Sequence, residues 1–145
     1  MNDKTDGSVQ EIMQWNDEKF SVRVESIDRQ HKQIFHLVND LYQALMNNKT
    51  HAEKSVILNE LVDHTVKHFS HEENCFKQFG YARCNEHTAQ HCDLVVRVSE
   101  FKKAFDSGKA DISQELIYFL RDWLHSHIGD SDKAFTPYML QNGIK

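Results

Sequence analysis

The stretch that decides the fold runs from His68 to His91 and reads HFSHEENCFKQFGYARCNEHTAQH. It contains two pairs of residues spaced four apart, His68 with Glu72 and His87 with His91. Residues at this spacing lie on one face of a helix, with their Cβ atoms about 5–6 Å apart. Each pair could therefore supply two ligands to one metal ion. Iron, zinc, copper and nickel all accept imidazole and carboxylate ligands.

The segment Phe79-Gly80-Tyr81 breaks the helical pattern between the two pairs. Glycine at this place is a good left-handed stop for a helix. A turn here folds the second helix of the pair back against the first, so that the two ligand pairs face each other. The stretch thus predicts a metal site inside a helix bundle, and the missing ligands must come from the rest of the chain.

The composition favours one helical domain. At 145 residues the chain is long enough for a proper core, and its one proline and five glycines favour long helices over many short strands. We expect residues 1–10 to be a flexible polar tail and residues 11–145 to form the bundle domain. Three cysteines cannot all pair within one chain, so we expect reduced thiols rather than a structural disulfide.

Charge and hydropathy also exclude several partners. The net charge is -5 with histidine neutral, and no run of lysine or arginine stands out, which argues against nucleic acid as a partner. No apolar run approaches the roughly 20 residues that a membrane span needs. The first ten residues carry no secretory apolar segment, so a cytoplasmic location is expected.

Apolar residues at helical spacing predict an all-α fold, an up-down-up-down four-helix bundle with an N-terminal extended arm. The arm covers residues 11–26, where alternation from Phe20 to Val24 would also suit a short strand. The first helix begins near Ser26 to Asp28, with Ser26 as its expected N-cap, and ends before residue 47. The second and third run from about Ala52 to Gln78 and from about Asn85 to Asp106, and the fourth starts near Ser113.

Several details of these helices are also expected. On the second helix the inner face includes His64 or Thr65. On the fourth, Leu116, Leu120, Trp123 and His127 are spaced 4, 3 and 4 apart, as in a packed seam. Gly129 should interrupt the helical pattern, and a further turn or two between residues 130 and 140 is limited by Pro137.

Every predicted helix offers a histidine on its inner face. A single inward histidine is usually an ordinary hydrogen-bonded core residue, but five of them on four helices would be costly to bury without a shared partner. A metal ion satisfies them together. The inward candidates are His31, His68, Glu72, His87, His91 and His127, with Asp130 or Asp132 as a second carboxylate.

These residues carry a resemblance to the bacterial hemerythrins, which are oxygen-binding di-iron proteins. The matching motifs extend over about residues 12 to 132. They are Asp28-Arg29-Gln30-His31-Lys32, His68-Phe69 with Glu72-Glu73, His87-x-x-x-His91, and Trp123-Leu124-x-x-His127-Ile128 followed by Asp132. Cys75 and Cys92 depart from the pattern near the site, although neither replaces a ligand.

The resemblance implies a ligand set of seven residues and two non-haem iron ions bridged by hydroxide or oxide. One iron would be held by His87, His91 and His127, and the other by His31 and His68. Glu72 and Asp132 would bridge the two ions. The family places its aspartate five residues after the last histidine, which selects Asp132 over Asp130. Glu73 is interpreted as a surface or salt-bridged residue. His36, His51, His64, His71 and His125 fall outside the ligand set.

The implied function is reversible binding of dioxygen for carriage, storage or sensing, without enzymatic activity. Two octahedral ions offer about twelve positions, and this ligand set leaves about one open, on the iron with two histidines. Apolar residues near the ligands would form a dry pocket; the candidates are Ile34, Phe35, Trp123 and Ile128. Dioxygen is the expected partner, and a sensor would also need a partner protein.

Two other functions fit parts of the pattern. A di-iron oxidase, a peroxidase or a nitric-oxide-handling protein would use a similar bundle, but four-helix di-iron enzymes carry more glutamate and less histidine. A structural zinc site might use Cys84, His87 and His91, yet such sites are four-coordinate, and seven well-placed ligands exceed that number.

Overall fold

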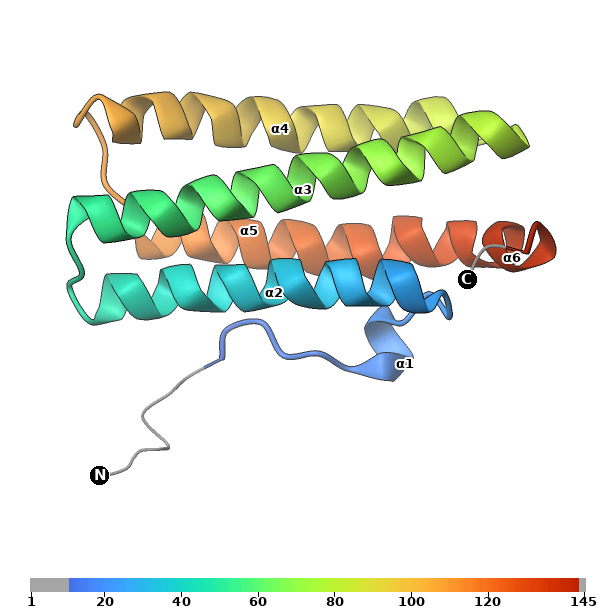
Figure 1. The fold of residues 1–145 in the computed structure, drawn as a ribbon, viewed down its shortest axis with the longest axis horizontal. Helices are drawn as coiled ribbons and strands as arrows, with labels where there is room; N and C mark the ends of the chain where they lie inside the picture. The colour runs from blue at the N-terminus through green and yellow to red at the C-terminus, as the bar shows by residue number, and fades with distance from the viewer. Residues whose placement is uncertain (1–10, 144–145) are drawn as a thin grey trace.

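Four long helices form the body of the molecule. The computed structural model describes residues 11–143, so the predicted tail of residues 1–10 lies outside the described part. The helices are α2 (Glu25–Met46), α3 (His51–Phe79), α4 (Cys84–Asp106) and α5 (Gln114–Ser126). They lie side by side with alternating direction (Figure 1), which confirms the all-α, up-down-up-down bundle. Within residues 11–143 there is no strand, so the alternation from Phe20 to Val24 does not produce one.

The helix ends follow local capping chemistry. Thr50 and Glu53 form a capping box at the start of α3, and the Ser113 hydroxyl accepts a hydrogen bond from the Leu116 N–H at the start of α5. Gly80 ends α3 in the left-handed conformation, with φ of 65° and ψ of 41°, as predicted.

The start of α2 differs from the prediction. Its N-cap is Val24, without a side-chain hydrogen bond, rather than Ser26. The cause lies in Asp28, whose carboxylate accepts hydrogen bonds from the Val22 N–H and the Ser21 hydroxyl. These bonds hold the incoming chain in a tight turn in which Arg23 has a φ of 60°. Asp28 therefore fixes how the N-terminal segment meets the helix.

The N-terminal arm packs against the bundle, as expected, but part of it is helical. The short helix α1 (Asp17–Phe20) interrupts the extended path and buries Phe20. Asn39 of α2 holds the arm through its amide, which accepts from the Met13 N–H at 2.8 Å and donates to the Met13 carbonyl at 2.9 Å. Figure 1 shows this segment beneath α2.

The C-terminal end of the bundle is more regular than predicted. Gly129 does not break the helix: α5 continues into a π-helix, η2 (His127–Asp132), and then into α6 (Lys133–Gln141) with Pro137 inside it. A π-helix absorbs one extra residue into a helix without ending it. The chain thus passes through residue 129 with its helical hydrogen bonds largely intact.

The core faces of two helices also differ in detail from the prediction. Thr65 is buried and His64 is exposed, which decides between the two alternatives. On α5 the buried residues are Ile117, Leu120 and Leu124, whereas Leu116 and Trp123 are only half-buried. The real seam is therefore shifted by one residue around the helix, with spacings of 3 and 4.

Buried polar residues lie between two apolar clusters. On α2, His31 lies between Ile27 of one cluster and Ile34 of the other. On α3, Glu72 lies between Phe76 and Phe69 in the same way. A polar layer thus crosses the bundle near one end. No helix in the described part of the chain is both long and apolar enough to cross a membrane.

Candidate metal centre

The structure brings the seven predicted ligand residues together in the polar layer. They form two overlapping groups whose nitrogen and oxygen atoms lie within 4.8 Å of one another. All seven side chains are buried. One group contains Glu72, His87, His91, His127 and Asp132, and the other contains His31, His68, Glu72 and Asp132. The two carboxylates are therefore common to both groups.

The π-helix explains why the last two ligands are spaced five apart. On an α-helix, residues five apart differ by about 140° around the axis, because each residue adds about 100°. In η2 the hydrogen bonds run from i to i+5, so a residue five positions on lies over the first. As a result His127 and Asp132 face the same site, with His127 Nε2 3.2 Å from Asp132 Oδ1.

The histidine nitrogens point at common centres. His31 Nε2 lies 2.8 Å from His68 Nε2, and His127 Nε2 lies 3.1 Å from His87 Nε2 and 3.0 Å from His91 Nε2. Two ligand atoms at right angles around an ion about 2.1 Å away would be about 3 Å apart. The spacing of the nitrogens therefore fits one metal ion per group.

Each carboxylate divides its two oxygens between the groups. Glu72 Oε2 lies 3.2 Å from His68 Nε2, and Glu72 Oε1 lies 3.2 Å from His91 Nε2. Asp132 Oδ2 lies 3.1 Å from His31 Nε2, and Asp132 Oδ1 lies 2.7 Å from His87 Nε2. All four oxygens are buried without a hydrogen-bond partner. Buried carboxylates are costly without positive charge nearby, and neutral imidazoles supply none, so this arrangement suits two bridged cations.

Electrostatics keep the carboxylates ionised, as ligands must be. Burial raises the pKa values of both carboxyl groups, and repulsion by Asp132 raises that of Glu72 further, but the surrounding imidazoles outweigh these effects. The pKa values of Glu72 and Asp132 consequently lie well below the usual range. Burial lowers the pKa of His87, yet its contacts with both carboxylates dominate and raise that pKa to about 9. For His127 the effect of burial outweighs the contact with Asp132, so the pKa of His127 is lowered.

Comparison with known proteins identifies the same family that the sequence motifs resemble. Residues 22–139 match the family model described as the hemerythrin HHE cation binding domain. The chain belongs to the hemerythrin family. A bacteriohemerythrin of Methylococcus capsulatus is 37% identical over 127 residues, which cover 87% of this chain and 95% of that protein. One of Stenotrophomonas maltophilia is 33% identical over 86% of this chain and 80% of its own length.

Solved structures of hemerythrin share the fold. A crystal structure of wild-type hemerythrin matches with a TM-score of 0.83 at 36% identity, covering 86% of this chain and 95% of that one. A structure of a hemerythrin mutant matches with a TM-score of 0.85 at 34% identity, covering 88% of this chain and 97% of that one. Hemerythrins are oxygen-binding proteins, and the buried histidine and carboxylate groups of this member are able to hold metal ions.

Three side chains in this hemerythrin contact the Nδ1 atoms of candidate ligand histidines. His68 Nδ1 lies 2.6 Å from Gln30 Oε1, His127 Nδ1 lies 2.7 Å from Gln90 Oε1, and His91 Nδ1 lies 2.9 Å from Glu73 Oε2. An acceptor at Nδ1 fixes the ring and leaves Nε2 for the metal. Glu73 was expected at the surface or in a salt bridge, and its side chain is 25% exposed and paired with His91.

Sequence reasoning did not name these acceptors, although a signal was present. Gln30 directly precedes a ligand, Glu73 directly follows one, and Gln90 lies three residues after one. Each therefore sits beside the ligand face of its own helix, within reach of a histidine on a neighbouring helix. The Nδ1 atom of His31 differs, since it is buried without a hydrogen-bond partner.

Aromatic rings cover two of the ligand imidazoles. Phe69 stacks on His91 with ring centroids 3.8 Å apart and an interplanar angle of 4°, and Trp123 stacks on His127 at 4.5 Å and 18°. Of the residues predicted to line a dry pocket, Ile34, Phe35 and Ile128 are buried and Trp123 is half-buried. The ligands thus lie in an apolar surrounding that limits access of water.

The remaining histidines and the cysteines do not belong to either ligand group. Exposed histidines include His64 and His71 as well as His36, which pairs with Asp40, and His51, which stacks on Phe105. His125 is half-buried and stacks on Phe20, so the expectation of a solvent-facing or boundary position describes it only in part. All three cysteines are free, and neither ligand group includes one, which disfavours the zinc site with Cys84.

Proposed function

We propose that this protein binds dioxygen reversibly at a non-haem di-iron centre. His87, His91 and His127 would hold one iron, His31 and His68 the other, and Glu72 and Asp132 would bridge them. The observation that carries the proposal is the division of each buried carboxylate between the two ligand groups. A site for one ion would not need two carboxylates placed in this way.

The unequal ligand groups support binding of a small molecule at one side. Three histidines serve one group and two serve the other, while both share the same carboxylates. A pair of ferrous ions held by these residues would supply two electrons to dioxygen, and the group with His31 and His68 offers one histidine fewer than the other. His31 and His68 would therefore border the position at which dioxygen binds.

The surroundings favour carriage, storage or sensing over catalysis. Beyond the seven ligands, the buried polar residues in the described part of the chain are Asn39, Lys54 and Thr65. The Asn39 amide is hydrogen-bonded to the Met13 backbone in the N-terminal arm, and Lys54 forms an ion pair with Asp111. The site thus has no spare acid, base or charged anchor for an organic substrate, which an oxidase or a peroxidase would use.

Anaerobic loading with ferrous iron, followed by admission of oxygen, tests the proposal. We expect two irons per chain and a visible absorption band that develops in air and disappears under argon over repeated cycles. An irreversible change to a ferric form, or release of hydrogen peroxide in every cycle, would favour an oxidase or a redox sensor. Binding of a single zinc ion and no iron would overturn the di-iron assignment.

Two matched histidine variants make this test specific. His68→Ala removes a buried ligand from α3, and we expect less than two irons per chain and loss of the oxygen-dependent band. His71→Ala changes an exposed histidine three residues further along the same helix and should retain both properties. Equal iron content in the two variants would contradict the role given to His68.

A further inference from the structure

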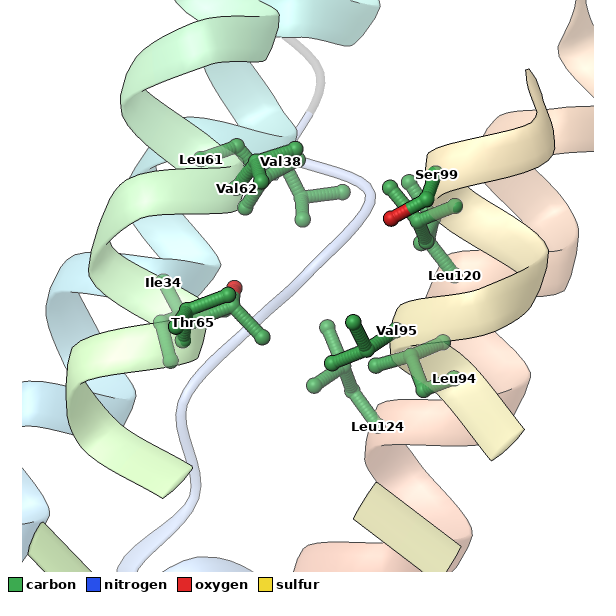
Figure 2. Close-up of a pocket in the computed structure, with 12 residues that line it drawn as sticks. Ile34, Val38, Leu61, Val62, Thr65, Leu94, Val95, Ser99, Leu120 and Leu124 are labelled. Carbon is green, nitrogen blue, oxygen red and sulfur yellow. The ribbon is translucent and has the colours of Figure 1, made fainter. Parts of the chain in front are cut away.

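A small polar cavity lies where the start of α4 meets η2, apart from the apolar cavity between the helix pairs. Figure 2 shows that aliphatic side chains dominate the apolar cavity, and the two cavities have no lining residue in common. In the polar cavity every lining side chain carries a nitrogen or oxygen atom. These residues are Tyr81, Arg83, Glu86, His87, Gln90 and Ser131. Their polar atoms make this cavity a site for a molecule that forms hydrogen bonds.

The size of the polar cavity restricts its occupant. Measured at the centre of a water-sized molecule, its volume is about 10 Å³, and about 10–15 Å³ on this measure holds one water. A buried water usually makes about two to four hydrogen bonds to the polar groups around it. The cavity therefore suits one water molecule in both size and chemistry, and a larger ligand would have to displace side chains.

His87 is the candidate ligand that borders this cavity. Its side chain is 3% exposed, and its Nε2 atom lies 2.7 Å from Asp132 Oδ1, so this atom faces the ligand groups. The outer part of the ring, which carries Nδ1, is left to border the cavity. Within residues 11–143 His87 Nδ1 has no hydrogen-bond partner, yet it is not sealed from solvent as His31 Nδ1 is. A water in the cavity is therefore the acceptor that remains for this nitrogen.

Other lining groups complete the hydrogen bonds of such a water. Gln90 Oε1 lies 2.7 Å from His127 Nδ1, which leaves the amide N–H groups of Gln90 to donate elsewhere. The hydroxyl of Tyr81 and the carboxylate of Glu86 are acceptors in the same lining. The water would accept from His87 and Gln90 and donate to Tyr81 or Glu86, so its own hydrogen bonds would be satisfied.

We propose that this cavity binds one ordered water molecule, which accepts a hydrogen bond from His87 Nδ1 and so supports this histidine as a metal ligand. The inference rests on the proposed function, in which His87 holds an iron ion through Nε2. An acceptor at Nδ1 orients a ligand ring and strengthens its donation to the metal. Glu73 and Gln90 do this for the other two rings of the three-histidine group. With the water, all three rings of that group have an outer acceptor.

A high-resolution crystal structure of the protein loaded with zinc is the direct test, because zinc accepts the same types of ligand and does no oxygen chemistry. We expect one ordered water within hydrogen-bond distance of His87 Nδ1. A native structure without a water at this place would overturn the proposal.

Two substitutions at Ser131 separate the water from its surroundings. The Ser131 hydroxyl lies 2.7 Å from Gln90 Oε1, and both substitutions remove this contact. Ser131→Leu also extends an aliphatic side chain into the cavity and should displace the water, whereas Ser131→Ala leaves the cavity open and should keep it. Loss of an outer partner typically weakens metal binding about 10–100-fold, so Ser131→Leu should bind zinc about tenfold or more weakly than Ser131→Ala. Equal zinc affinities would overturn the supporting role of the water.

Exchange of the ring N–H protons gives a second measurement on the native chain, which remains decisive if Ser131→Leu does not fold. Nuclear magnetic resonance of the zinc-loaded protein with isotope-labelled histidine resolves these protons. The Nδ1 proton of His87 should exchange with solvent faster than those of His91 and His127, because a water rather than a protein side chain accepts it. Equal or slower exchange at His87 would overturn the contact with water. None of these measurements involves oxygen, so failure here and failure of reversible oxygen binding are distinguishable.

Discussion

Glu73 is the one charged acceptor among the three side chains that hold the ligand rings from behind. Gln30 and Gln90 present neutral amides to His68 and His127, while the Glu73 carboxylate accepts from His91 at 2.9 Å. A carboxylate at this place makes the imidazole a stronger donor to its metal than an amide does. The group with three histidines therefore receives the additional negative charge.

Substitution of Glu73 should separate two effects of this side chain, its orientation of the His91 ring and its negative charge beside the site. Glu73→Ala removes the acceptor of His91 and should weaken metal affinity about 10–100-fold, as is typical when such partners are lost. Glu73→Gln keeps an acceptor oxygen and should retain the metal, but with a higher midpoint potential because a negative charge beside the site is gone. Metal titration and potentiometry measure the two effects. Equal behaviour of the two variants would contradict this separation.

At the scale of the element, the π-helix η2 determines the position of Asp132, the last candidate ligand. Its i to i+5 hydrogen bonding places Asp132 over His127, and an α-helix over the same residues would turn the carboxylate away. In the sequence, the only sign of this arrangement is the spacing of five residues between His127 and Asp132. The family resemblance selects Asp132 from this spacing, whereas α-helical periodicity does not. This is why Gly129 was wrongly predicted to interrupt the helix.

Adding one residue to η2 should uncouple the fold from the site. An alanine inserted after the exposed Asp130 places the aspartate six residues after His127, a spacing that turns the two about 240° apart on an α-helix and exceeds the π-helical repeat. We expect a helical protein by circular dichroism that binds less than two irons per chain. Asp130→Ala keeps the length of η2 and should bind two. Full iron content in the insertion variant would show that the spacing set by the π-helix is not needed.

The junction between α3 and the loop before α5 depends on one ion pair. Lys54 is 7% exposed, and its Nζ lies 2.7 Å from Asp111 Oδ1. The hydrogen bond from Lys54 lowers the pKa of Asp111. A carboxyl group with a lowered folded-state pKa stabilises the fold above its unfolded pKa, about 3.9, and loses this contribution as the pH falls through its folded pKa.

Asp111→Asn should therefore destabilise the protein in a pH-dependent way. Because Asp111 is 69% exposed, solvent screens the pair and we expect a loss of about 1 kcal/mol in the free energy of unfolding at pH 7. The difference from the native protein should shrink below about pH 4, where the native carboxyl also becomes protonated. Urea unfolding at the two pH values measures it. A difference independent of pH would exclude the charge as its cause.

Across the described part of the molecule, a polar layer lies between two apolar clusters, and the N-terminal arm packs against the bundle. Phe20 anchors this arm: it is 4% exposed and lies with its ring centroid 5.3 Å from that of Phe35 and 5.1 Å from that of His125. Lys133 of α6 also donates to the Glu18 carbonyl, which ties the arm to the C-terminal helix. The arm is therefore part of the packed structure.

Phe20→Ala should test the contribution of the arm to stability. Removing a buried phenylalanine typically costs about 3–5 kcal/mol, and we expect the lower end because the arm can shift into the space. Leu140→Ala, at a position 48% exposed, should change the free energy of unfolding by less than about 0.5 kcal/mol. Chemical unfolding monitored by helical circular dichroism compares them. Similar values for both variants would mean that the arm does not stabilise the bundle.

The sequence predicts the bundle and the ligand cluster well because both depend on local spacing. Pairs four apart on one helix and the stop at Gly80 can be read without knowledge of the tertiary fold. The contacts of Gln30, Glu73 and Asp28 could not be predicted in this way, because each joins the side chain of one element to a group on another or to the incoming chain. The one-residue shift of the α5 seam likewise follows from packing rather than from periodicity.

The order of the ligands along the chain has a consequence for biosynthesis. They extend from residue 31 to residue 132, and all four long helices or their continuations contribute. A growing polypeptide on the ribosome lacks the second shared carboxylate until residue 132 has been made. The iron of the proposed centre would consequently be bound only after all four long helices have been synthesised.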